Sequence, residues 1–168
     1  MYDERFMRRA IEIARDALAV LGVAPFGAVV VKDGVIVGEG VNLTGRTFDP
    51  TAHGEVEAIR AAATRLGTSD LSSCDLYTSC EPCALCVAAM HISRIRHLYF
   101  GASIAEAADA FAALMPTLID DVDALRRAAS APASGGRVPA EQKLGPDAVP
   151  ILREWASLCC ASATGGSA

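Results

Sequence analysis

The pattern of apolar and polar positions divides the first part of the chain into one helix and two strands. Apolar residues recur at helical spacing over residues 2–21, which predicts an amphipathic helix. Two Val-rich runs follow, 26–31 and 35–41, and Asp33-Gly34 lies in the short connection between them. Because Asp-Gly between two apolar runs is a strong hairpin signal, we predict that these runs pair as antiparallel strands.

The remainder of the chain alternates between helical and strand patterns. Helices are predicted over residues 51–66 and 81–91, strands over 74–78 and 95–100, a helix over 105–129 that Pro116 breaks or kinks, a loop over 132–150, and a short final helix over 149–159. A hairpin followed by alternating strands and helices predicts an α/β fold with a mixed sheet and helices on both faces. We expect a single domain over residues 1–160 and a flexible tail over 161–168.

Charge and hydrophobicity narrow the classes of protein to consider. The 168 residues carry a net charge of −5, with 52% hydrophobic and 21% charged residues. No apolar run approaches the ~20 residues that a membrane-spanning helix needs, and the first residues lack the pattern of a signal peptide. We therefore expect a cytoplasmic enzyme. The acidic balance argues against nucleic acid as the main partner, because such binding depends on Lys and Arg meeting phosphates.

The cysteines indicate a metal site rather than disulfides. Six are present, and without a secretory signal metal binding or free thiols are the better interpretation. Cys83 and Cys86 stand three apart at the start of a predicted helix, so their sulfurs can share one face, and a helix N-terminus favours the thiolate that zinc requires. Of the three histidines, His53 is the one beside a carboxylate at a helix start. His-Cys-Cys leaves a fourth position for water, which is typical of a catalytic zinc.

A proton shuttle must accompany such a site, and two glutamates are candidates. Glu55 follows His53 by two residues, and residues two apart on a regular helix do not face each other. Glu57 lies one turn from His53. Spacing alone leaves both open.

Two motifs together carry a resemblance to a known family. His53-Gly54-Glu55 with Pro82-Cys83-Ala84-Leu85-Cys86 resembles the His-x-Glu and Pro-Cys-x-x-Cys signature of the cytidine deaminase superfamily. Residues 25–29, 49–53 and 77–83 are further similar to the branch that holds bacterial guanine deaminases and tRNA adenosine deaminases. The similarity covers residues 6–101, and the last third of the chain matches poorly.

The resemblance implies a fold, a site and an oligomer. The implied fold is a three-layer α/β/α sandwich with a mixed five-stranded sheet, and the implied oligomer is a homodimer. His53, Cys83 and Cys86 would bind Zn²⁺, and Glu55 would be the general acid and base. The substrate would be contacted by Asn42 through a hydrogen bond, by Phe26 as a stacking wall, and by Ala52 and Trp155, although Trp155 is most simply interpreted as a packing residue of the last helix.

The expected function is zinc-dependent hydrolytic deamination of a free nucleobase or a related amino-heterocycle. Guanine or guanosine deaminase, tRNA adenosine deaminase, and a binding protein whose zinc is purely structural are the alternatives. Guanine deaminases carry a Phe-Asp-Asp run where this chain has Phe111-Ala112-Ala113-Leu114, without an acid. We therefore expect free bases to be preferred over tRNA and guanine to be a poor substrate, unless Glu106 or Asp109 replaces the missing carboxylates.

Overall fold

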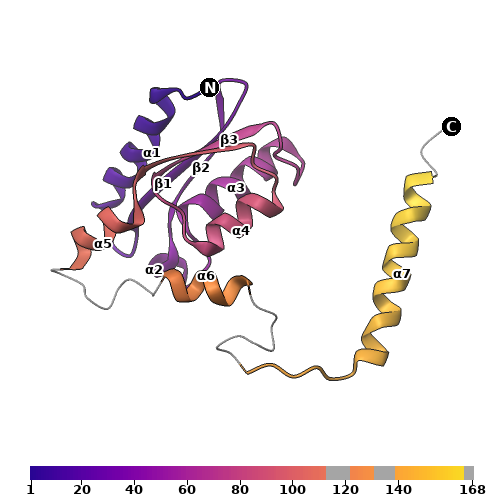
Figure 1. Ribbon diagram of the computed structural model, residues 1–168. Coiled ribbons are helices and arrows are strands. Elements are labelled where there is room, and N and C mark those ends of the chain that lie inside the picture. Colours follow the sequence, from indigo (N-terminus) through magenta and orange to yellow (C-terminus); the bar gives the residue numbers. More distant parts are fainter. Residues whose placement is uncertain (113–121, 131–138, 165–168) are drawn as a thin grey trace. The chain divides into compact units, whose positions relative to one another are not determined.

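The protein consists of four strands and seven helices in the residues that the computed structural model describes, which are 1–112, 122–130 and 139–164 (Figure 1). The elements are α1 (Glu4–Ala17), β1 (Ala24–Lys32), β2 (Val35–Asn42), α2 (Thr44–Thr47), α3 (Gly54–Leu66), β3 (Cys74–Cys80), α4 (Ala84–Ile92), β4 (His97–Ala102), α5 (Ile104–Ala112), α6 (Val122–Ser130) and α7 (Gly145–Thr164). The chain divides into two compact units, residues 1–126 and 127–168. The single domain expected over residues 1–160 therefore stays a prediction.

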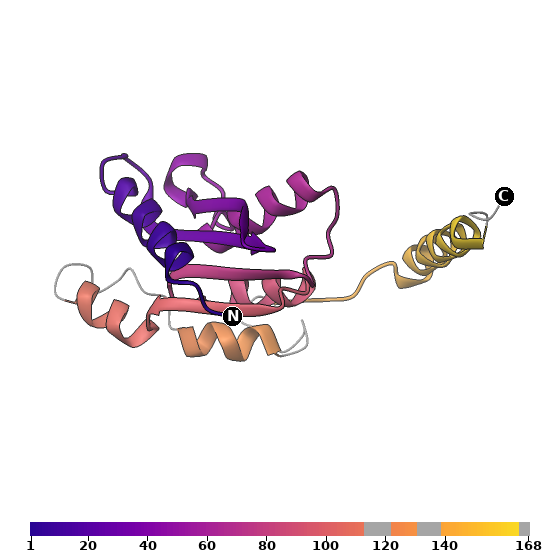
Figure 2. The ribbon, with the colours of Figure 1, turned by 90° about the horizontal axis from the view of Figure 1, so that it is seen from above.

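The strands form one mixed sheet in the order β2-β1-β3-β4 (Figure 2). β1 is antiparallel to both β2 and β3, and β3 is parallel to β4. Asp33 and Gly34 connect β1 to β2 with φ values of 49° and 76°, as a tight hairpin turn with two left-handed residues requires. The α/β class, the mixed sheet and all four strands predicted from the residue pattern are confirmed. The fifth strand that the resemblance implies is not found among the described residues.

Helices pack on both faces of this sheet (Figure 1). On one face, Phe6 and Met7 of α1 pack against Val29, Val31 and Tyr77. On the other face, α3 and α4 cover alternate residues of the same strands, and this larger core comprises Ala28, Val30, Val37, Ala58, Ile59, Ala62, Leu71, Cys74, Leu76 and Met90. Successive residues of β1 therefore contribute in turn to the two cores on opposite faces of the sheet.

Glycines in β2 bring the N-terminal half of α3 directly onto the strand backbone. A Cβ at Gly38 would lie 2.3 Å from the carbonyl oxygen of Ala58, and one at Gly40 would lie 2.2 Å from that of Gly54. Any side chain at these positions would force the helix away from the sheet. The close approach places the first residue of α3 beside the carboxyl end of β2.

Several element boundaries differ from the predicted ones. A short helix, α2, lies between β2 and α3, α1 ends at Ala17 rather than at residue 21, and the zinc-motif helix α4 begins at Ala84 rather than Glu81. Helix α7 begins at Gly145 and reaches Thr164, so it covers the end of the predicted loop and the start of the predicted tail. Pro146 explains the early start, because the first turn of a helix needs no N–H from its residues.

Two described helices correspond to the helix predicted over residues 105–129. α5 and α6 occupy the two ends of that range. Pro116, where we expected a break, lies outside the described residues. Across the described ranges, every helix is too short or too polar to cross a bilayer.

Candidate active site

Two helix starts meet at one edge of the sheet and carry the predicted metal ligands. His53 is the N-cap of α3, with extended backbone angles of −75° and 153°. Cys83 is the N-cap of α4, with angles of −73° and 174°, and Cys86 lies in the first turn that follows. The sequence pattern predicts Cys83 inside the helix, whereas in the structure Cys83 lies one residue before the helix begins. As an N-cap with extended backbone, Cys83 still projects beside Cys86, because the first turn of α4 begins at the next residue.

The three ligand atoms are spaced as a tetrahedral metal requires. His53 Nδ1 lies 3.5 Å from the Sγ atoms of both Cys83 and Cys86, and the two sulfurs are 3.7 Å apart. With Zn–S bonds of about 2.3 Å and Zn–N bonds of about 2.0–2.1 Å, tetrahedral angles give S···S of about 3.8 Å and S···N of about 3.6 Å. His53, Cys83 and Cys86 therefore fit zinc with one position left over, and they form a group within the described residues that could hold a metal ion.

Protons are shared unevenly within this group. Hydrogen bonding with the Cys86 thiol, opposed by burial, lowers the pKa of Cys83 to about 4. The same contact, together with burial, raises the pKa of Cys86, and hydrogen bonding with Cys83 raises the pKa of His53. The side chains of His53, Cys83 and Cys86 thus lie close enough to compete for the same protons. Because metal binding displaces protons from thiols and imidazole, a bound cation would relieve that competition.

Glu55, and not Glu57, lies beside the metal ligands. Its carboxylate is 6% exposed. One oxygen accepts from Cys86 Sγ at 3.4 Å and the other from Thr78 Oγ1 at 3.3 Å. Burial raises the pKa of Glu55, as expected for a carboxyl group removed from water. A carboxyl group with a raised pKa takes up a proton more readily than an exposed one, as a general acid or base requires.

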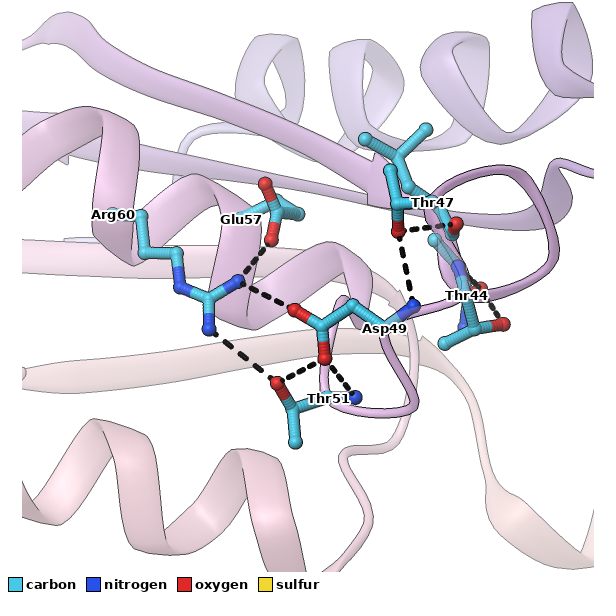
Figure 3. A network of polar contacts seen from close by, with 8 residues as sticks. Thr44, Thr47, Asp49, Thr51, Glu57 and Arg60 are labelled. Carbon is cyan, nitrogen blue, oxygen red and sulfur yellow. Dashed lines mark hydrogen bonds and ion pairs between the residues drawn. The ribbon is translucent and has the colours of Figure 1, made fainter.

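Glu57 points away from the metal ligands. It forms an ion pair with Arg60 at 2.5 Å, and Arg60 also reaches Asp49 and Thr51 (Figure 3). Helical spacing does not relate His53 to Glu55 or Glu57, because His53 is an extended cap residue rather than part of the helix. From that position, His53 and Glu55 can face the same cavity.

A cavity of about 440 Å³ opens over this group. Its lining includes His53, Glu55 and Cys83, and it also includes two predicted substrate contacts, Asn42 and Phe26. This volume is in the range of small-molecule sites. The structure therefore brings five of the eight predicted site residues together around one cavity.

The other three predicted residues are Cys86, Ala52 and Trp155. Cys86 is buried beneath the cavity and contributes through its sulfur. Ala52 is buried and does not line the cavity. Trp155 belongs to α7, in the second unit, where its side chain is 66% exposed. The substrate contacts expected of Ala52 and Trp155 stay predictions.

Sequence reasoning missed several residues of the cavity. The lining also contains Ala24, Thr44, Cys80, Glu81, Ile104, Ala107, Phe111 and Leu125. The rings of Phe26 and Phe111 meet edge to face, with centroids 6.1 Å apart. Thr78, which hydrogen-bonds Glu55, lies two residues before Cys80 on β3 and could have been found from the period of the strand. The comparison with the Phe-Asp-Asp run pointed to residues 111–114, but only the tertiary fold shows that Phe111 lines the cavity from α5.

The acidic residues considered as replacements for the missing carboxylates do not line the cavity. Glu106 caps α5, where one of its oxygens accepts from both the backbone N and the Oγ of Ser103 at 2.7 Å. Asp109 is exposed on the same helix. Glu81 does line the cavity, but its oxygens are engaged by the backbone N of Ile104 at 3.0 Å and by Arg126 at 3.3 Å. Ala113 and Leu114 lie outside the described residues.

Comparison with known proteins extends these observations. Residues 1–102 match the cytidine and deoxycytidylate deaminase zinc-binding region. Guanine deaminase from Bacillus subtilis is 44% identical over 110 residues, which cover 66% of this chain and 70% of that protein. A solved structure of that enzyme has a TM-score of 0.80 and 36% identity, and the alignment covers 94% of this chain and 95% of that chain. A tRNA-specific adenosine deaminase from Haemophilus influenzae is 46% identical over 103 residues, covering 61% of this chain and 59% of that protein. The matched region contains His53, Glu55, Cys83 and Cys86.

Proposed function

The chain belongs to the cytidine and deoxycytidylate deaminase family and is a zinc-dependent hydrolytic deaminase, and on this premise we propose that it acts on a free nucleobase or a related amino-heterocycle. The observation that carries the proposal is the position of Glu55, buried against Cys86 at the floor of a cavity that His53 and Cys83 also line. A zinc ion bound to the three ligands would make a water molecule acidic enough to supply a nucleophile near neutral pH.

We propose that Glu55 moves the protons of the reaction. Burial raises its pKa above the ordinary value of a carboxyl group, which favours uptake of a proton. It would accept a proton from water, deliver it to a ring nitrogen and then protonate the departing amine. The bond from Thr78 orients one carboxylate oxygen and leaves the other facing Cys86. Phe26 and Phe111 offer aromatic walls for a flat ring, and Asn42 offers a hydrogen bond at its edge.

Within this class we propose that free bases are preferred over tRNA and that guanine is a poor substrate. The net charge of −5 opposes a polyanionic substrate. Glu55 is engaged in the chemistry, and Glu81, the other carboxylate of the lining, already accepts from Ile104 N and pairs with Arg126, which reduces its capacity to accept the ring N–H and amino protons of guanine. Leaving such donors unpaired costs about 1–3 kcal/mol each, or about tenfold to a hundredfold in rate.

An ammonia-release screen tests this proposal. It would compare cytosine, guanine, isoguanine, adenine, triazines, their nucleosides and tRNA by steady-state kinetics. We expect a free base other than guanine to have the highest kcat/KM. Guanine in first place would identify a guanine deaminase like the Bacillus subtilis relative, and tRNA in first place would favour a wobble-base deaminase. No ammonia from any of them would leave only a binding role.

We also propose that the enzyme is a homodimer, because apolar side chains on the zinc-motif helix face solvent in the single chain. Val87 and Ile92 of α4 are 47% and 81% exposed, and a second subunit packed on this helix would remove such groups from water. Sedimentation at micromolar protein should give the mass of two chains. A fully active monomer would contradict the dimer.

The complete architecture is proposed on the same family grounds. A fifth strand beyond the free edge of β4 would complete the three-layer sandwich, since helices already cover both faces of the four described strands. The single domain over residues 1–160 and the cytoplasmic location likewise stay predictions.

A further inference from the structure

Asn42 is the last residue of β2 and lies at the cavity. The oxygen of its side-chain amide accepts hydrogen bonds from Thr44, and the nitrogen does not have a partner among the described residues. The residue is 8% exposed and lines the cavity. The backbone N of Thr44 lies 3.2 Å from Asn42 Oδ1, and Thr44 Oγ1 lies 2.8 Å from the same atom. Because a backbone N–H can only donate, the atom that it meets must be the amide oxygen. This contact determines which way the amide faces.

The other end of the amide has no partner within the described part of the chain. No residue there accepts a hydrogen bond from Asn42 Nδ2, and no buried side-chain nitrogen or oxygen among these residues lacks a partner. Nδ2 is therefore accessible rather than sealed in the core, and the accessible space beside Asn42 is the cavity. An amide with its oxygen engaged presents donors alone to a ligand.

We propose that Thr44 is a positioning residue that fixes the Asn42 amide, so that the substrate must bring a hydrogen-bond acceptor, a ring nitrogen or a carbonyl oxygen, to Nδ2. The proposal rests on the proposed function for the identity of the ligand class. The proposal also limits which heterocycles bind. A heterocycle with an N–H or an amino group facing Asn42 Nδ2 would place two donors together and leave both of them unpaired. Thr44 acts through Asn42 and need not touch the substrate.

Replacing the Thr44 hydroxyl isolates its contribution. Thr44→Val keeps the shape and the backbone N–H but removes the shorter of the two bonds. For the best base of the screen we expect KM to rise about threefold to tenfold with kcat within about twofold, because one neutral hydrogen bond that orders the binding group is lost. Thr44→Ser should restore the KM of the wild-type enzyme.

Thr47 supplies the matched control. It is on the same short helix, visible beside Thr44 in Figure 3, but its hydroxyl donates to the carbonyl oxygen of Leu43 at 3.0 Å and does not touch Asn42. Thr47→Val should leave both KM and kcat unchanged. An equal rise in KM for the Thr44 and Thr47 variants would reduce the effect to general loosening of the loop and overturn the assignment.

The Asn42→Asp variant tests whether Asn42 donates or accepts the hydrogen bond with the substrate. A carboxylate can still accept from Thr44, so only the group facing the cavity changes, from donor to acceptor. We expect KM to rise about tenfold to a hundredfold with the zinc content unchanged. Retained KM would mean that Asn42 accepts from the substrate. In addition, Thr44→Val should have no further effect in an Asn42→Ala background, because Thr44 has then lost the group that it positions.

Calorimetry separates this inference from the proposed function. The probes are purine, which has no amino group to lose, and its 1-deaza, 3-deaza and 7-deaza analogues, each lacking one ring acceptor. We expect one analogue to bind the wild-type zinc enzyme about tenfold more weakly than purine and to bind Asn42→Ala no more weakly than purine. That result would uphold the inference even if no base released ammonia. Equal binding of all four probes to the wild-type protein, or no binding of any, would overturn it.

Discussion

Glu55→Gln is expected to keep the fold and the bound zinc but to lose deaminase activity by at least about 10³-fold. A positioned general acid or base contributes about 10²- to 10⁴-fold for one proton transfer, and here one carboxyl group would serve several. Gln keeps the size of the side chain and can still accept a hydrogen bond from Thr78. It cannot take up a proton. The measurements are kcat by ammonia release and zinc per chain by metal analysis.

Glu57→Gln is the matched control for this experiment. Glu57 lies two residues further along α3 and forms its ion pair with Arg60 outside the cavity. Exposed ion pairs contribute about 0–1 kcal/mol to stability, so this variant should keep its activity. If Glu57→Gln were the inactive protein and Glu55→Gln the active one, the assignment of the proton shuttle would be wrong.

Cys86→Ser is expected to reduce bound zinc from about one ion per chain to a small fraction of that, with loss of activity. Cys86 supplies one of three ligand atoms, and a serine hydroxyl is a poor zinc ligand at neutral pH because it holds its proton. His53→Ala should act in the same way. Metal analysis after dialysis gives the zinc content, and thermal unfolding with and without added zinc reports how much the ion stabilises the fold.

Cys80→Ser provides the control for the zinc ligands. Cys80 is also half-buried and also lines the cavity, but it does not belong to the group of three residues that could hold the ion. It should retain about one zinc per chain. Loss of zinc from this variant would indicate a fourth protein ligand. The site would then be closed and structural rather than catalytic.

Whether the site can bind guanine depends on which of its acidic side chains already have hydrogen-bond partners. The relative with 44% identity is a guanine deaminase. In this chain the acids near the cavity are committed to other partners, Glu106 to Ser103 and Glu81 to Ile104 and Arg126. Recognition of a base depends on one or two such groups, and a site that lacks a partner for a buried donor discriminates strongly against it. Overall similarity is therefore a weaker guide to the substrate than the state of these side chains.

The amino-acid sequence by itself determined most of the elements and pointed to the group of residues that could hold a metal ion. Period-2 runs of Val, the Asp33-Gly34 turn and glycine-ended helices are local signals, and each reflects a backbone preference that neighbouring residues do not override. The group that could hold zinc was also predictable, because Cys and His at particular spacings are typical donors for that ion. The C-terminal helices were less well predicted, since proline was interpreted as a loop signal, whereas α7 contains Pro146 in its first turn and Pro150 inside the helix.

The tertiary structure decided what spacing could not. The choice between Glu55 and Glu57 depends on the extended backbone at His53, which is a property of the helix start and not of helical periodicity. The roles of Thr78 and Phe111 arise because β3 and α5 reach the same cavity from distant parts of the chain. The direction of the Asn42 amide depends on a bond from the backbone of Thr44. In each case the deciding quantity is a distance or a direction between groups, which local preferences do not encode.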